Sequence, residues 1–299
     1  MFTRRQFMAA SAAATALPGR LWSATSLTAG ETEILTLSDG HLVMPEALIY
    51  GDRDPAATRT LIAEMGGMNG GLQPPCNLTL LRRGSDVVLF DAGAGTGFMP
   101  TAGELPDALD AVGLAPSDIT HVIFTHGHPD HLWGVLDDFD DPLFAEAQHY
   151  MGGQELAYWS DPATADSIGA ERQAFAAGAI RRLGILEGMV EAFADGDAVL
   201  PGITAVATPG HTPGHMSFAI ETEAGPVMVV GDAVVNDHLA LADPGAEAPN
   251  DQDPATAAAT RLALLDRIAS EDATVIGFHM GHGGMGKLAR DGNGYRFRP

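Results

Sequence analysis

The chain contains little cysteine and little positive charge. Its 299 residues include one cysteine, Cys76, and one lysine, Lys287, and 39 acidic side chains outnumber 16 basic ones, for a formal net charge of −23 at pH 7. A single cysteine excludes an intrachain disulfide. So acidic a surface, without a basic cluster, argues against nucleic acid and anionic membranes as partners. We therefore expect a small-molecule ligand of low negative charge.

The chain also lacks a low-complexity linker and an internal repeat. Its 36 glycines and 19 prolines are spread along the sequence, as in a fold with many turns. A chain of this length could form one large domain or two average ones. Since the candidate site residues extend from 126 to 279 without a visible linker, we predict a single domain over residues 25–299.

The first 24 residues differ in composition from the rest. Arg4 and Arg5 precede the small, apolar segment 9–17, which is too short to span a bilayer as a helix. This arrangement resembles a twin-arginine export signal. The resemblance implies cleavage near residues 23–24, with Ala16 as a competing site, and a bacterial periplasmic or secreted location.

Four side chains that can bind a metal ion lie within six residues. His126, His128, Asp130 and His131 form the pattern H-x-H-x-D-H directly after the apolar run 119–124, which predicts a buried strand. Neutral imidazoles and a carboxylate suit zinc and similar divalent ions. A histidine-rich loop that binds nothing is the alternative, and it is disfavoured because the chain offers further ligands.

Three further candidate ligands lie at the ends of predicted strands: His211 in the loop after the run 203–207, Asp232 directly after 227–231, and His279 directly after 275–278. The ends of strands in a rigid sheet are a usual place for a functional site. His282 is the rival of His279, and we prefer His279 because it follows its strand directly. Cys76 is interpreted as a buried structural thiol. Five other histidines are interpreted as ordinary polar or packing residues: His41, His121, His149, His215 and His238.

This order of candidate ligands resembles that of the metallo-β-lactamase superfamily. The resemblance implies the fold class, an α/β four-layer αββα sandwich of two mixed sheets flanked by helices. It also implies two divalent metal ions, zinc in the first place and manganese, iron or cobalt as alternatives. By position, the first ion would be held by His126, His128 and His211, and the second by Asp130, His131 and His279. Asp232 would bridge both ions. Asp91, in an Asp-x-Gly loop, would orient one of the metal-binding side chains without binding an ion itself.

A narrower resemblance concerns the C-terminus. The run from His279 to Leu288 and the segment Gly294-Tyr295-Arg296-Phe297 are similar to the end of methyl parathion hydrolase and its relatives. It implies that His279 is the metal ligand and that His282 stands where those relatives have an aromatic pocket residue, so His282 is a candidate substrate contact. No tyrosine follows Asp232 as in many lactonases of the superfamily, which argues against a homoserine-lactone substrate.

These resemblances imply a metal-dependent hydrolase that cleaves an ester or lactone, or a phosphotriester, with a metal-bridging hydroxide. Asp130 would be catalytic, since it could orient the hydroxide and pass a proton to the leaving group. Asp232 argues against a β-lactamase, and His128 argues against a diiron oxidoreductase. The complete ligand set argues against a metal-binding module without activity. Because relatives commonly dimerise, a homodimer is expected.

Apolar patterns predict further elements. A strand followed by a turn is expected over 33–40, further strands over 77–82 and 87–90, and helices over 104–112, 153–160, 170–184 and 254–268. Four large side chains are candidates for the substrate pocket, although such residues more often belong to a core: Met151, Leu156, Trp159 and Phe175.

Overall fold

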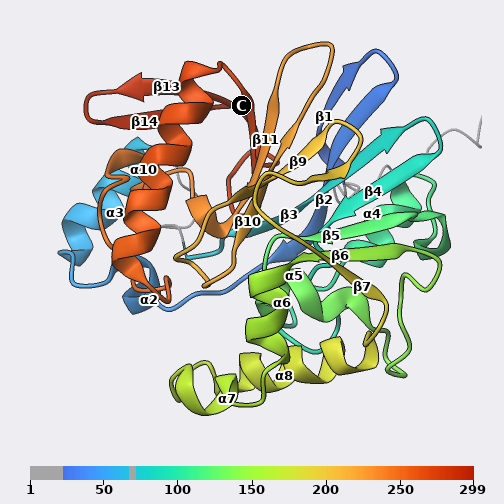
Figure 1. Ribbon diagram of the computed structural model, residues 1–299. Coiled ribbons are helices and arrows are strands. Elements are labelled where there is room, and N and C mark those ends of the chain that lie inside the picture. Colours follow the sequence, from blue (N-terminus) through green and yellow to red (C-terminus); the bar gives the residue numbers. More distant parts are fainter. Residues whose placement is uncertain (1–22, 67–71) are drawn as a thin grey trace, which may run out of the picture.

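The computed structural model describes residues 23–66 and 72–299, and two sheets of seven strands each form its centre (Figure 1). The strands of the first sheet follow one another in chain order: β1 (Ser23–Ala29), β2 (Thr32–His41), β3 (Pro75–Arg83), β4 (Asp86–Phe90), β5 (His121–Phe124), β6 (Gln148–Gly152) and β7 (Val190–Phe193). Pairing is antiparallel from β1 to β4 and parallel from β4 to β7, so the sheet is mixed.

The second sheet uses the C-terminal third of the chain. Its strands also lie in chain order: β8 (Ala198–Leu200), β9 (Ile203–Ala207), β10 (Met216–Ile220), β11 (Val227–Gly231), β12 (Thr274–Gly277), β13 (Met285–Asp291) and β14 (Gly294–Arg298). Only β11 and β12 pair in parallel. The other neighbours are antiparallel. This sheet is therefore mixed as well.

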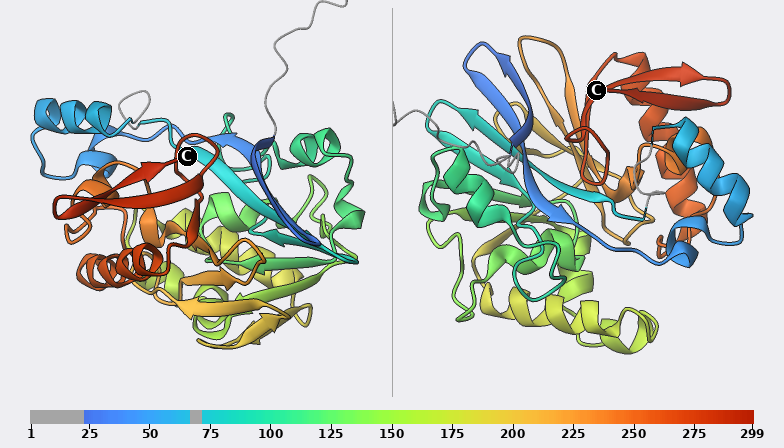
Figure 2. Two further views of the ribbon diagram at one scale, coloured as in Figure 1. Left: turned by 90° about the horizontal axis from the view of Figure 1, so that it is seen from above. Right: turned by 180° about the vertical axis from the view of Figure 1, so that it is seen from behind.

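Helices cover the outer faces of both sheets. Those of the described chain are α2 (Glu46–Tyr50), α3 (Pro55–Glu64), α4 (Leu105–Ala111), α5 (Pro129–Leu132), α6 (Gly153–Ser160), α7 (Thr164–Ser167), α8 (Gln173–Ile185), α9 (Leu239–Ala242) and α10 (Pro254–Ser270). Side chains of α4, α6 and α8 share a core with the first sheet, and α9 and α10 share one with the second. Figure 2 shows α10 and α8 on different sides of the sheets.

A third core fills the space between the sheets. Phe90 on β4 packs against Phe218 on β10, with ring centroids 5.3 Å apart, and Ile34, Ile123 and other aliphatic side chains surround them. Burying a side chain of this size stabilises a fold by about 1.5–3 kcal/mol. Three cores separated by two sheets define four layers, so the predicted αββα sandwich is confirmed.

The predicted elements are confirmed within a few residues, but several others were not predicted, among them β1, α2 and α3. These three carry weak patterns: β1 overlaps the end of the segment that resembles an export signal, and α2 has only five residues. Of that predicted signal, residues 1–22 lie outside the described residues. None of the helices in residues 23–66 and 72–299 combines the length and the apolar character that a membrane crossing needs.

Candidate metal centre

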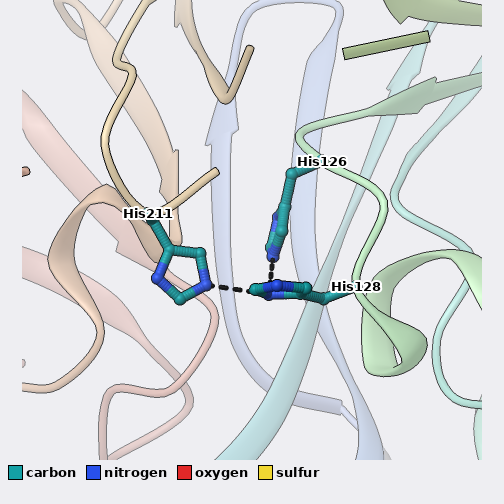
Figure 3. Close-up of side chains that lie close together, drawn as sticks. All are labelled: His126, His128 and His211. Atoms are coloured by element: carbon teal, nitrogen blue, oxygen red, sulfur yellow. Dashed lines mark hydrogen bonds between the residues drawn. The ribbon is translucent and has the colours of Figure 1, made fainter. Parts of the chain in front are cut away.

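Three imidazole nitrogens meet at one edge of the two sheets. His126 and His128 lie on the loop after β5, and His211 lies on the loop between β9 and β10. His128 Nδ1 is 3.0 Å from His126 Nε2 and 2.9 Å from His211 Nε2, as the dashed lines in Figure 3 show. All three side chains are buried. Because they come from both sheets, only the folded chain brings them together.

A second group of side chains lies beside the first. Asp130 Oδ2, on α5, is 3.1 Å from His279 Nε2 and 3.5 Å from His131 Nε2. Asp232 lies between the groups, with Oδ2 3.3 Å from His211 Nε2 and 3.5 Å from His279 Nε2. Its Oδ1 is 3.5 Å from His131 Nε2. The structure thus gathers all seven predicted ligand side chains, and Asp232 contacts both groups.

Hydrogen bonds on the outer side of the rings orient their inner nitrogens. Three such contacts join Nδ1 to a carboxylate or carbonyl oxygen: His131 to Asp91 (2.8 Å), His211 to Asp251 (3.0 Å) and His279 to the carbonyl of Pro75 (2.8 Å). Each acceptor places the proton on Nδ1 and leaves the lone pair of Nε2 facing the cluster. Histidines that bind metal ions are usually held in this way.

Three atoms of the cluster are buried without a hydrogen-bond partner among the described residues: Asp130 Oδ2, His131 Nε2 and Asp232 Oδ1. A buried polar atom without a partner costs about 1–3 kcal/mol. Their convergence therefore calls for a ligand that satisfies all of them. Imidazole nitrogens and carboxylate oxygens suit zinc, manganese, iron and cobalt, so these donor atoms fit the two divalent ions that the sequence predicts.

The charges of the two groups differ. Burial, followed by the neighbouring imidazoles, lowers the pKa of His126 and of His128 well below the usual value, so the first group presents neutral rings. Burial would also lower the pKa of His131, but the charges of Asp130 and Asp232 outweigh it and raise this pKa to about 10. The carboxylates thus favour positive charge at the second group, which a divalent cation would supply.

A cavity of about 340 Å³ opens onto the cluster. Asp130, Asp232 and His279 form part of its wall, while much of the remaining lining is apolar: Leu42, Met44, Leu48, Ile49, Phe98, Met99 and Phe175. Apolar walls with a few polar groups are typical of sites for small molecules. A carboxylate-rich centre at one end of such a cavity can act on a polar bond of a largely apolar ligand.

Comparison with known proteins agrees with this geometry. A family model described as the metallo-beta-lactamase superfamily matches residues 72–279, which include every side chain of the cluster. The chain belongs to the metallo-β-lactamase superfamily. An N-acyl homoserine lactonase of a Bacillus sp. is 31% identical over 126 residues, 42% of each chain. The N-acyl homoserine lactonase AttM of Azorhizobium caulinodans is also 31% identical over 126 residues, 41% of this chain and 44% of that protein. The alignments thus span about two fifths of these curated relatives.

Solved structures of the superfamily match nearly the whole chain. The hydrolase AbOPH has a TM-score of 0.85 and 26% identity, and the match covers 94% of this chain and 98% of that one. AidC, described as a dizinc quorum-quenching lactonase in complex with a product, has a TM-score of 0.86 and 21% identity over the same shares. Similarity at that identity establishes the fold, and the metallo-β-lactamase sandwich is therefore common to all three chains.

Asp91 supports the second group from outside, in the manner the Asp-x-Gly resemblance implies. It lies directly after β4 with φ 65°, a left-handed conformation that is uncommon for a residue other than glycine. Its Oδ1 accepts a hydrogen bond from the backbone N–H of Thr125 at 2.7 Å, and its Oδ2 accepts from His131. The carboxylate thus ties the end of β5 to a predicted ligand.

Two further supports were not predicted from the sequence. Glu155, fully buried on α6, accepts hydrogen bonds from the backbone N–H of Gly127 at 3.0 Å and of Gly214 at 2.9 Å. It therefore joins the two loops that carry the first three histidines. Asp251 accepts from His211 and from the buried Arg261, at 2.8 Å from Arg261 Nη2. Both acids contact residues far away in the chain, so no local pattern distinguishes them from surface carboxylates.

The structure does not bring His282 to the cluster. The residue has φ 56° in the turn between β12 and β13, its side chain is exposed, and it lies outside the cavity lining. Positive φ at residues 282–284 reverses the chain, which explains this position. Of the four predicted pocket residues, Phe175 lines the cavity, and the others belong to the core beneath it: Met151, Leu156 and Trp159.

Two residues interpreted as ordinary lie closer to the site than expected. Cys76 is buried, and one possible ligand atom each of Cys76, Asp130 and His279 lies within 4.8 Å of the others. Burial raises the pKa of the Cys76 thiol to about 12, so a neutral structural thiol remains its interpretation. His238 lines the cavity. His215 was expected to pack or form hydrogen bonds, and its Nε2 accepts from the backbone N–H of Asp232 at 3.0 Å.

Proposed function

We propose that the protein is a dinuclear metal-dependent hydrolase that cleaves lactones or carboxylic esters. The observation that carries this proposal is the cluster of seven buried or nearly buried ligand side chains at the end of an apolar cavity. His126, His128 and His211 would hold one ion. The other ion would be held by Asp130, His131 and His279, with Asp232 shared between the two.

In the proposed reaction, the bound ions, Asp130 and the apolar walls of the cavity have separate roles. When bound, two divalent ions would lower the pKa of a coordinated water towards neutrality and stabilise the negative charge that develops on the carbonyl oxygen. Asp130 lines the cavity, where its carboxylate can accept a proton from the attacking water and donate it to the leaving oxygen. The apolar walls exclude bulk water and hold the substrate against the centre.

The substrate class follows from the cavity and from the relatives. Much of the lining is apolar, and its polar side chains lie at the metal centre, in the loop after β11 and at positions such as Arg53, Glu171 and Arg172. A ligand with a polar end at the metal centre and a largely apolar remainder fits such a cavity. Curated relatives named N-acyl homoserine lactonases favour a lactone over a β-lactam. The C-terminal Tyr295 lies outside the cavity lining and donates to Asp266 on α10 at 2.6 Å. That segment therefore supports the fold, and we rank phosphotriesters second.

The proposal is tested with a panel of substrates. Protein loaded with zinc, manganese or cobalt is assayed against lactones, aryl esters, phosphotriesters and β-lactams, beside chelator-treated protein. We expect hydrolysis of lactones or esters that chelation abolishes and added metal restores. Faster cleavage of a penicillin or carbapenem than of any lactone or ester would overturn the substrate class, and activity that survives chelation would overturn the metal mechanism.

A further inference from the structure

The loop after β11 places two polar side chains in the cavity wall that the proposed mechanism does not use. Asn236 and His238 follow Asp232 by four and six residues, and both line the cavity together with Asp130 and His279. The lining residues next to them in the chain are apolar: Val235, Leu239 and Ala240. A polar group among apolar neighbours has either a structural partner or a ligand.

The backbone fixes the orientation of the Asn236 amide. Its Oδ1 accepts hydrogen bonds from the backbone N–H of Ala240 at 2.9 Å and of His238 at 3.3 Å. Only the oxygen of an amide can accept, so these two donors determine which way the group is turned. The Nδ2 group, with two N–H donors, has no acceptor among the residues that the structure describes.

The backbone also fixes the tautomer of His238. Its Nδ1 accepts from the N–H of Leu239 at 2.8 Å at the start of α9, so the ring proton is on Nε2. The side chain is buried, and burial lowers its pKa to about 4, so the ring is neutral at pH 7. Nε2–H has no acceptor among residues 23–66 and 72–299. Two neutral donors of one loop are therefore left for whatever fills the cavity.

We propose that Asn236 Nδ2 and His238 Nε2 donate hydrogen bonds to a second carbonyl group of the substrate, outside the bond that is cleaved. The proposal rests on the proposed hydrolase function and narrows its substrate to acylamino lactones or esters. The reacting carbonyl lies at the metal centre, so donors along the wall serve another acceptor. An alkyl lactone without that carbonyl leaves both donors desolvated and unpaired, and a site of this kind discriminates against it.

The test compares two substrates and matched variants. The substrates are an N-acylated amino lactone and an alkyl lactone of equal chain length that lacks the amide. Asn236→Asp keeps Oδ1 for the backbone N–H groups but removes the donor. His238→Phe removes the ring donor, and His238→Asn restores an amide donor and a cap for α9. His149→Phe is the control, because His149 is also buried with a pKa lowered to about 4 and lies outside the cavity lining.

With metal-loaded protein we expect Asn236→Asp and His238→Phe to lose roughly tenfold in kcat/KM on the acylamino lactone and little on the alkyl lactone. His238→Asn should regain part of the loss, and His149→Phe should match the wild type. Equal losses on both substrates, or no loss on the acylamino lactone, would overturn the proposal. Melting temperatures identify a variant that fails to fold, in which case Asn236→Asp decides.

A binding measurement separates this inference from the proposed function. The ring-opened acylamino acid is titrated into wild-type protein and Asn236→Asp by calorimetry, whether or not either turns over substrate. Roughly tenfold weaker binding to the variant supports the donor role even when turnover fails. Equal binding to both proteins, or no binding to the wild type, refutes it. Absence of turnover with intact, donor-dependent binding would instead count against the hydrolase alone.

Discussion

Replacing Glu155 with glutamine should weaken the first metal site selectively. Glu155 Oε1 accepts from Gly127 N–H at 3.0 Å and from Trp159 Nε1 at 2.5 Å, and Oε2 accepts from Gly214 N–H at 2.9 Å. A glutamine keeps one acceptor oxygen, so its NH₂ group faces at least one backbone N–H. A buried donor left in this way costs about 1–3 kcal/mol.

The expected effect follows from where that energy is lost. Gly127 lies between the two histidines of the first loop, and Gly214 lies three residues after His211, so both loops would relax away from the first group. Loss of a residue that orients metal ligands typically weakens binding by about 10–100-fold. We expect the first-site Kd for zinc to rise by a factor in this range, while the second site, held by other elements, changes little.

The assay is a zinc titration against a chromophoric chelator, with the melting temperature of metal-free protein measured in parallel. Asp39→Asn is the matched control: Asp39 is also buried and accepts from the backbone N–H groups of Ala94 and Leu105, at 2.8 and 2.7 Å, away from the first-site loops. It should lower the melting temperature but spare the first site. If Glu155→Gln lowers only the melting temperature and both zinc affinities stay at the wild-type level, the positioning role is refuted.

Three further predictions concern the metal centre and export. Asp232→Ala should reduce metal content and nearly abolish turnover, because both groups lose a shared carboxylate; full metal content by elemental analysis would exclude a bridge. His279→Ala should bind one ion, whereas His282→Ala, with its exposed side chain, should bind two and keep its kcat/KM; a titration with the reverse result would exchange their roles. We also propose export by the twin-arginine route, so replacing Arg4 and Arg5 together by lysine should trap precursor in the cytoplasm, and an unchanged periplasmic yield on immunoblots would disprove it.

The predicted ligands could be read from the sequence because they lie in or at the start of loops that follow apolar runs. His126, His211, Asp232 and His279 mark four strand ends, and such ends meet at one edge once the two sheets pack. The cavity and its supports could not be read in this way. Glu155 acts through contacts across the fold, and a surface glutamate in a short helix would have the same local sequence.

The loop after Asp232 illustrates the same limit. No tyrosine follows Asp232 in the sequence, which argues against a homoserine-lactone substrate. The structure shows two other donors, on Asn236 and His238, whose direction depends on backbone hydrogen bonds within the loop. His282 is the opposite case. A resemblance predicts a position in the pocket, whereas positive φ angles at residues 282–284 turn the side chain outwards. Residue type alone therefore predicts neither the two donors in the cavity wall nor the outward position of His282.

The seven ligand side chains are divided unequally along the chain, and this division has a practical consequence. Four belong to residues 126–131, in the part of the chain that forms the first sheet, and three belong to the C-terminal third that forms the second. The connection between β7 and β8 is short and exposed, so it is a natural place to cut the gene. Neither fragment would then hold a complete ligand set for either ion. Reassembly of the two pieces should depend on divalent metal, which would make the pair a genetically encoded reporter of available zinc.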